Sequence, residues 1–245
     1  MHCQPKHKHA VYIWLKNTQT CLICDEGTES PDCVCNCCET ELPWLIEHCE
    51  ICALPLAMQG LICGQCQQQP PAFKQVVAPW TFSFPVDTLI TRFKHQARWP
   101  LGHLLGRLLG RFLRHRFENA ELHRPDCLLP VPMAAKRLRE RGYNQAQMLA
   151  RWLGQDLGIA FDEHLLLRPH ETVAQQALDA KTRKRNLLGA FVLAPDAQVQ
   201  GRHFALVDDV LTTGATAHSL ARLLMQAGAR QVDVYCLART PKPGN

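Results

Sequence analysis

The stretch FALVDDVLTTGAT, residues 204–216, carries most of the information that this sequence holds about its fold. Four apolar residues precede two adjacent acids, and a threonine-rich turn with one glycine follows. An apolar run without polar alternation is typical of a strand buried on both faces of a parallel sheet. Because ligands of open α/β sheets bind at the carboxyl ends of the strands, we expect Asp208 and Asp209 to emerge at that edge.

The residues after the acid pair suit a phosphate group. A helix is predicted over residues 214–227, and the free backbone N–H groups of a helix N-terminus attract anions. Thr212, Thr213 and Thr216 add hydroxyl donors. The carboxylates would repel a phosphate, so they suit sugar hydroxyls or a metal ion. The stretch therefore predicts a site for a sugar phosphate such as ribose 5-phosphate.

Two alternatives compete with a sugar-phosphate site. An acid at a strand end also occurs in the Walker B element of NTPases, but those enzymes need a G-x-x-x-x-G-K-[ST] loop. The sequence contains neither that loop nor the G-x-G-x-x-G of dinucleotide-binding proteins. A turn with a purely structural role stays open as the second alternative.

Length and composition limit the class of protein. With 245 residues, 47% hydrophobic and 20% charged, the chain can form one substantial core or two unequal domains. The first residues lack the pattern of a signal peptide, and no segment has the length of a membrane span. We therefore expect a cytoplasmic protein, in which cysteines serve as metal ligands before they form disulfides.

Positive charge is concentrated in the middle of the chain. The net charge is +5, but residues 92–151 hold 13 Lys and Arg against four Asp and Glu. Residues 1–91 are acidic, with four against nine, and residues 152–245 are nearly balanced. Such a basic stretch favours phosphates or nucleic acid, and a solvated helix face is the simpler alternative.

Strand and helix patterns alternate from Phe73 onward. Apolar residues at i, i+3, i+4 and i+7 predict helices over residues 86–97, 100–117, 143–157 and 214–227. Short apolar runs predict strands within residues 73–82, 126–132, 164–167, 191–194, 204–207 and 231–238. This alternation predicts an α/β domain with a mostly parallel sheet flanked by helices. Glycines at 102, 106 and 110 are expected to let the second of these helices pack closely.

Cysteine spacing predicts two metal sites before the α/β domain. Among 13 cysteines, four C-x-x-C pairs occur, and ten residues separate the two pairs of each half. Two such pairs supply the four thiolates of a structural zinc site, which favours two zinc ions over redox pairs or disulfides. The predicted ligands are Cys21, Cys24, Cys35, Cys38, Cys49, Cys52, Cys63 and Cys66. Cys33 and Cys37 remain alternatives within the second pair.

The acid pair and its threonine loop resemble the signature of type I phosphoribosyltransferases, which bind phosphoribosyl pyrophosphate (PRPP) with Mg²⁺. The resemblance implies that Asp208 and Asp209 contact the ribose hydroxyls. It also implies that the loop that follows holds the 5-phosphate, through Thr212, Thr213, Gly214, Ala215 and Thr216.

Two further segments, residues 128–151 and 168–191, are similar to the ComF family, which includes GntX-like proteins. The resemblance implies a type I phosphoribosyltransferase-like domain at residues 71–240, a double zinc ribbon at 21–70 and a tail at 1–20. It also implies a role in natural transformation and in the use of imported single-stranded DNA, with the DNA-uptake machinery at the inner face of the membrane as a partner.

Basic residues are the candidates for pyrophosphate or DNA. A basic loop follows the strand that we expect beside the acid-bearing strand, and arginine binds phosphate oxygens in a bidentate manner. The candidates are Lys136, Arg137, Arg141, Arg168, Arg183 and Arg185. Trp80, Trp99 and Tyr143 are candidates for stacking on nucleic-acid bases.

Three functions stay open. The first is a protein that binds PRPP and handles imported single strands. The second is an active phosphoribosyltransferase on a nucleobase or related acceptor, for which no catalytic residue can be named. The third is a PRPP-sensing regulator that binds nucleic acid without chemistry.

Overall fold

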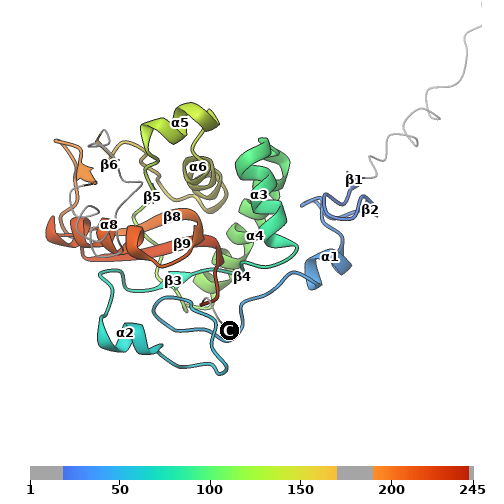
Figure 1. The fold of residues 1–245 in the computed structure, drawn as a ribbon, viewed down its shortest axis with the longest axis horizontal. Coiled ribbons are helices and arrows are strands. Elements are labelled where there is room, and N and C mark those ends of the chain that lie inside the picture. The colour runs from blue at the N-terminus through green and yellow to red at the C-terminus, as the bar shows by residue number, and fades with distance from the viewer. Residues whose placement is uncertain (1–18, 170–189, 243–245) are drawn as a thin grey trace, which may run out of the picture. The chain divides into compact units, whose positions relative to one another are not determined.

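The computed structural model describes residues 19–169 and 190–242 (Figure 1). The chain forms two compact units, Met1–Glu41 and Leu42–Asn245. In the smaller unit, β1 (Gln19–Thr20) pairs antiparallel with β2 (Gly27–Thr28), and α1 (Asn36–Thr40) follows. No helix among the described residues has both the length and the apolar character needed to cross a bilayer.

A five-stranded sheet forms the centre of the larger unit. Its strands are β3 (Val76–Val77), β4 (Trp80–Thr81), β5 (Cys127–Pro130), β8 (His203–Leu211) and β9 (Gln231–Arg239). The order is β3-β9-β8-β5, with β4 also on β9, and every pairing is parallel. The α/β fold with a mostly parallel sheet, predicted from the sequence, is confirmed.

Helices pack against this sheet. Helix α6 (Gln145–Leu157) contacts β5 and β8, and α8 (Ala215–Gln226) contacts β9. Helices α3 (Val86–Gln96) and α4 (Trp99–Glu118) contact each other, and α4 also contacts α6. Two short helices complete the described set, α2 (Gly64–Gln68) and α5 (Ala135–Arg141). The four longer helices match the expected periodic segments.

The glycines of α4 allow close helix packing, as expected. A Cβ at Gly102 would lie 2.5 Å from the Phe93 ring of α3, and one at Gly106 would lie 3.4 Å from side chains of α6. Larger residues at Gly102 would therefore force α3 and α4 apart.

Two segments differ from expectation. Residues 135–141 form α5 and not a loop, because this run is rich in good helix formers and ends at Gly142, whose φ of 83° suits glycine. The apolar runs at β6 (Leu166–Leu167) and β7 (Val192–Leu193) do not join the parallel sheet. They pair antiparallel with each other.

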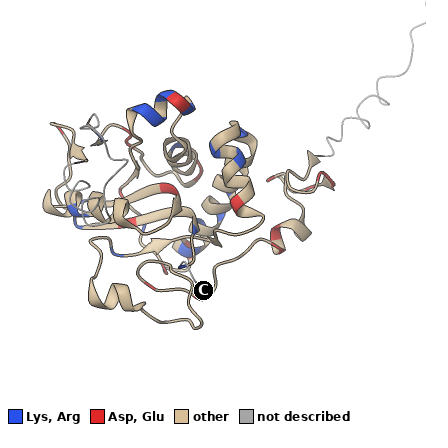
Figure 2. Cartoon of the chain, viewed as in Figure 1, with Lys and Arg blue, Asp and Glu red and all other residues tan. Residues whose placement is uncertain are grey.

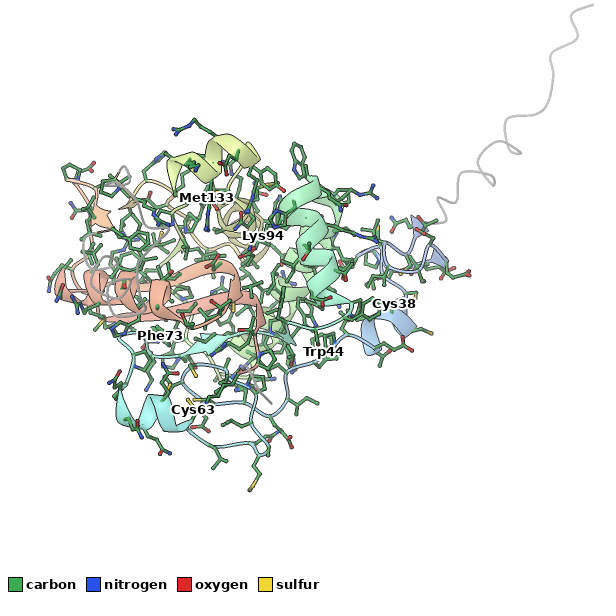
Figure 3. The ribbon with its side chains drawn as sticks, in the orientation of Figure 1. Cys38, Trp44, Cys63, Phe73, Lys94 and Met133 are labelled. Carbon is green, nitrogen blue, oxygen red and sulfur yellow. The ribbon has the colours of Figure 1, made fainter. Side chains whose placement is uncertain are left out.

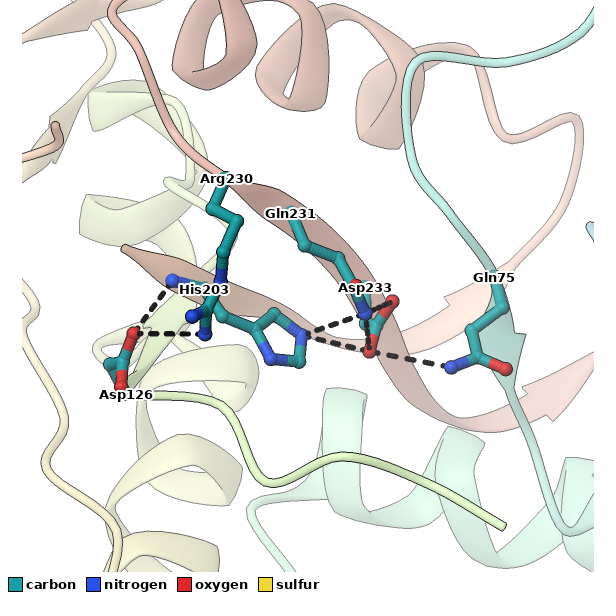
Figure 4. Close-up of polar contacts among 6 residues, drawn as sticks. All are labelled: Gln75, Asp126, His203, Arg230, Gln231 and Asp233. Carbon is teal, nitrogen blue, oxygen red and sulfur yellow. Dashed lines mark hydrogen bonds and ion pairs between the residues drawn. The ribbon is translucent and has the colours of Figure 1, made fainter. Parts of the chain in front are cut away.

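A buried polar cluster occupies the amino-terminal edge of the sheet (Figure 4). The His203 Nε2 atom lies 2.9 Å from Asp233 Oδ2, and both side chains are buried. Gln231 and Gln75 donate to the same carboxylate, and the His203 backbone N–H donates to Asp126. Because ligands bind at the opposite edge of such sheets, we assign this cluster to fold stability.

Candidate functional site

The turn between β8 and α8 forms the predicted phosphate loop. Gly214, with a φ of 74°, is the residue before the first turn of α8, and glycine adopts this left-handed conformation without strain. The Thr213 hydroxyl accepts a hydrogen bond from the Ala215 N–H at 3.4 Å. Thr212 and Thr213 are exposed, whereas Ala215 and Thr216 are half-buried. The loop thus presents hydroxyl groups beside the N–H groups of a helix N-terminus.

The acid pair lies within β8 and not beyond its end. The strand continues to Leu211, and successive side chains point to opposite faces of a sheet, so the two acids have different surroundings. Asp208 is half-buried, whereas Asp209 is buried and its Oδ2 atom lies 2.6 Å from Lys94 Nζ. Lys94 belongs to α3 and is labelled in Figure 3. The expectation that both acids emerge at the edge is therefore wrong for Asp209, which an internal cation already neutralises.

Backbone amides also orient both carboxylates. Asp208 Oδ1 accepts from the Asp209 N–H, and Asp209 Oδ1 accepts from the Val210 N–H, each at 2.9 Å. Burial, followed by the negative charge of Asp209, raises the pKa of Asp208 well above its ordinary value. Asp208 therefore binds a proton more readily than an ordinary aspartate does.

Arg239 at the end of β9 is a site residue that the sequence patterns did not indicate. Its Nη1 atom donates to the backbone carbonyls of Leu211 at 3.1 Å and Thr212 at 2.5 Å, and its Nε atom donates to Cys52 at 2.9 Å. The side chain is 6% exposed. Arg239 thereby ties the start of the threonine loop to a cysteine knuckle. Its place in an apolar strand offered no signal, because the carbonyls that it binds are distant in sequence.

The basic candidates divide into two groups. Lys136 and Arg137 are both exposed on α5, where Figure 2 shows basic residues next to an acidic one. Strand β5, which leads to α5, pairs parallel with β8, so α5 follows the sheet edge that carries the threonine loop. Arg141 donates to Gln145 Oε1 at 2.5 Å.

The remaining candidates lie later in the chain. The Arg168 guanidinium lies over the Phe191 ring, 5.4 Å from its centroid. Arg183 and Arg185 lie outside the described residues.

The eight predicted cysteines form two groups, each with its four Sγ atoms within 4.8 Å of one another. The first group, Cys21, Cys24, Cys35 and Cys38, belongs to the smaller unit. Cys33 and Cys37 are not part of it, and the Cys33 thiol instead donates to Gln19 Oε1 at 3.5 Å. Four clustered thiols fit a tetrahedral zinc site with cysteine ligands alone.

The second group, Cys49, Cys52, Cys63 and Cys66, belongs to the larger unit. Burial raises the pKa of Cys49, but N–H groups of Cys63, Cys52 and Ile51 outweigh it and lower the pKa to about 7. This knuckle is joined to the sheet, because the Val76 N–H donates to Ile51 and Arg239 donates to Cys52. Two groups of four cysteines fit the expected double zinc ribbon.

A shallow cavity of about 270 Å³ lies between α4 and α6. It is lined by His103, Gly106, Arg107, Trp152, Gln155 and Asp156. None of the predicted site residues lines it, so it is separate from the threonine loop.

Comparisons with known proteins identify the family. The chain is 36% identical over 207 residues to DNA utilization protein YhgH of Salmonella typhimurium, covering 84% of this chain and 90% of that protein. It is 34% identical to competence protein F of Haemophilus influenzae, with the same coverage. The chain belongs to the ComF family. No protein-family model matches this ComF-family sequence.

Solved structures align with the ComF-family chain over a shorter part. A purine phosphoribosyltransferase from Pyrococcus horikoshii aligns with 55% of this chain and 74% of its own, at 15% identity and a TM-score of 0.37.

Proposed function

We propose that this ComF-family protein binds PRPP with Mg²⁺ at the β8–α8 junction and handles imported single-stranded DNA in the cytoplasm. The observation that carries the proposal is the junction itself, in which a half-buried acid precedes exposed threonine hydroxyls and a helix N-terminus. An anion bound by α8 and a diol bound by a carboxylate are the two ends of a ribose 5-phosphate.

Each residue of the junction has a role in this proposal. The N–H groups of Ala215 and Thr216, with the hydroxyls of Thr212 and Thr213, would bind the 5-phosphate. Asp208 would accept hydrogen bonds from the ribose hydroxyls, and in its ionised form it would favour a nearby Mg²⁺. The ion would supply positive charge to the pyrophosphate of PRPP.

The ion pair with Lys94 limits how Asp209 can bind the ribose. Asp209 pairs with Lys94 at 2.6 Å, so a ribose hydroxyl has to share this carboxylate with the ammonium group or displace it. Because the side chain of Lys94 is 28% exposed, it can turn towards solvent or towards a bound pyrophosphate. Asp209 therefore contributes less to PRPP affinity than Asp208 does.

The nucleic-acid part rests on the family and on charge. Relatives bear names that refer to DNA utilization and competence. Residues 92–151, with 13 basic against four acidic residues, include α4 and α5 of this chain. We expect binding to single strands that weakens as salt rises, because basic side chains release counterions from the phosphates. The DNA-uptake machinery would be its partner.

Isothermal titration with PRPP and Mg²⁺ tests the site. We expect Asp208→Asn to weaken PRPP binding by roughly 10-fold or more, because a charged acceptor loses its charge, and Asp209→Asn to weaken it less. Asp196→Asn, at an exposed acid elsewhere in the larger unit, is the matched control. If a folded Asp208→Asn protein binds PRPP with unchanged affinity, the PRPP site does not include this carboxylate.

Release of pyrophosphate separates a binding protein from a transferase. PRPP incubated with the protein and with a nucleobase or single-stranded DNA would yield pyrophosphate only if a ribosyl group is transferred. A PRPP-sensing regulator would instead show DNA affinity that changes with PRPP, without any pyrophosphate.

A further inference from the structure

One aromatic side chain at the beginning of α4 is unusually exposed. Trp99 is 53% exposed, whereas Trp80, another stacking candidate, is fully buried against Trp44 and belongs to the core. A large aromatic ring on the surface has a high cost in contact with water and is enriched at binding surfaces. The Trp99 ring meets Tyr143 edge-to-face, with centroids 6.2 Å apart and planes at 79°.

The partner ring is held firmly. The Tyr143 hydroxyl donates to the backbone carbonyl of Phe93, and the centroids of the Tyr143 and Phe93 rings lie 5.9 Å apart. The residue after Phe93 is Lys94, whose ammonium group pairs with Asp209 of the acid pair. The aromatic pair is thus linked, through one turn of α3, to the site proposed for ribose.

Basic residues flank both rings in the sequence. Arg92 and Arg98 are exposed, and Ala97 and Arg98 each donate a backbone N–H to the Arg92 carbonyl, so the two arginines lie at one corner of the chain. Arg141 precedes Tyr143 by two positions, and its side chain donates to Gln145 Oε1 at the start of α6. Residues 92–99 and 141–143 contain no Asp or Glu. An exposed aromatic ring in a segment that carries exposed arginines is complementary to a base with its phosphates.

We propose that Trp99, supported by Tyr143, stacks on a base of a single-stranded nucleic acid whose phosphates contact Arg98 and Arg141. This inference rests on the proposed function, since it places the strand beside the PRPP site. A single strand fits better than a duplex, because only an unpaired base offers its whole face to an exposed ring. The stacked base would then be connected to the acid pair through Tyr143, Phe93 and Lys94, so PRPP binding could affect its contact with Trp99.

Fluorescence titration with a labelled oligothymidine of about 20 nucleotides, longer than the site of a single-strand-binding fold, tests the inference on the full, zinc-loaded chain. We expect Trp99→Ala to weaken binding by roughly 5- to 150-fold, the range for loss of one stacked base. Trp99→Phe should retain most of the affinity, because it keeps a ring. Met58→Ala, which removes another exposed apolar side chain of the larger unit, is the control and should bind as the native chain does.

Arg98→Ala gives an independent measurement. It should lower the slope of log affinity against log salt by about 0.7 if one phosphate of a single strand contacts this side chain. Competition with an oligothymidine duplexed with oligoadenosine should be weak. Competition with free thymidine should also be weak if the phosphates contribute, and strong competition by the nucleoside would overturn the assigned phosphate contacts.

The outcomes distinguish the two proposals. Native affinity in Trp99→Ala, with clear binding by the native protein, would overturn the stacking site and leave the proposed function intact. A native protein that binds PRPP but no single strand would overturn both the stacking site and the DNA part of the function.

Discussion

At the scale of residues, neighbours in the chain have opposite surroundings. Asp209 is buried and paired with a lysine, whereas Asp208 is half-buried and faces the repulsion of that neighbour. Arg239 donates to the backbone carbonyls of Leu211, the last residue of β8, and Thr212, the first residue of the threonine loop. Two acids that look equivalent in the sequence are therefore distinguished by single contacts: Asp209 is held in an ion pair, and Asp208 is left for the proposed ligand.

The raised pKa of Asp208 predicts a pH-dependent cost for the folded protein. The folded state holds the proton of this acid more tightly than the unfolded chain does, so stability falls as the pH rises from the ordinary range of an aspartate through the raised pKa. Asp208→Asn should therefore be more stable than the native chain at about pH 8, and the gain should shrink towards about pH 5. Urea denaturation at both values checks this, with Asp196→Asn as control.

A gain that is equal at the two pH values would contradict the burial and repulsion assigned to Asp208. The same variant is expected to bind PRPP more weakly. Greater stability with lower affinity would show that this carboxylate is retained for a ligand at the expense of the fold.

At the scale of elements, α4 both packs against neighbouring helices and carries the proposed stacking residue. Its glycines let α3 and α6 pack closely against it, and its first residue is the exposed Trp99. The position of α3 in turn sets where Lys94 meets Asp209. A change in the α3–α4 contact should therefore shift Lys94 relative to Asp209.

Gly102→Ala tests this contact. A methyl group there would lie 2.5 Å from the Phe93 ring, so we expect the free energy of unfolding to fall by about 1–3 kcal/mol through overpacking. Gly64→Ala, where nothing lies within 4 Å, is the matched control and should change stability little. Thermal or urea unfolding measures both. Equal stability of the two variants would mean that α3 and α4 are not packed as described.

At the scale of the whole molecule, the two cysteine groups are integrated differently. The second group belongs to the larger unit and is joined to the sheet by Val76 and Arg239. The first group belongs to the smaller unit, Met1–Glu41. Two metal sites of the same chemistry are thus expected to stabilise different parts of the protein.

Substitution of one ligand in each group separates the two sites. We expect each variant, Cys24→Ser and Cys63→Ser, to bind one zinc ion fewer than the native chain by metal analysis. Cys63→Ser should also destabilise the sheet by more than about 5 kcal/mol, because structural zinc contributes ~10–16 kcal/mol in small zinc-binding peptides. Cys24→Ser should leave unfolding of the larger unit nearly unchanged. A similar loss in both variants would contradict the separate units.

The sequence by itself determined the parts that depend on short-range patterns. Helical periodicity, short apolar runs, C-x-x-C spacing and the acid–threonine signature predicted the α/β fold, eight clustered cysteines and the loop before α8. They did so because helix faces, buried strands and thiol knuckles are set by residues a few positions apart. The prediction of a basic loop failed at α5, because the helix-forming residues of this segment form a helix.

Only the tertiary structure decided which charges and rings meet. The pairing of Lys94 with Asp209, the bonds of Arg239 to the loop and to Cys52, and the contact of Trp99 with Tyr143 join residues far apart in the chain, up to 187 positions for Arg239 and Cys52. Such contacts depend on how strands and helices pack, and no local pattern encodes a partner at that separation. Burial, which distinguishes Trp80 from Trp99 and Asp209 from Asp208, is likewise a property of the packed chain.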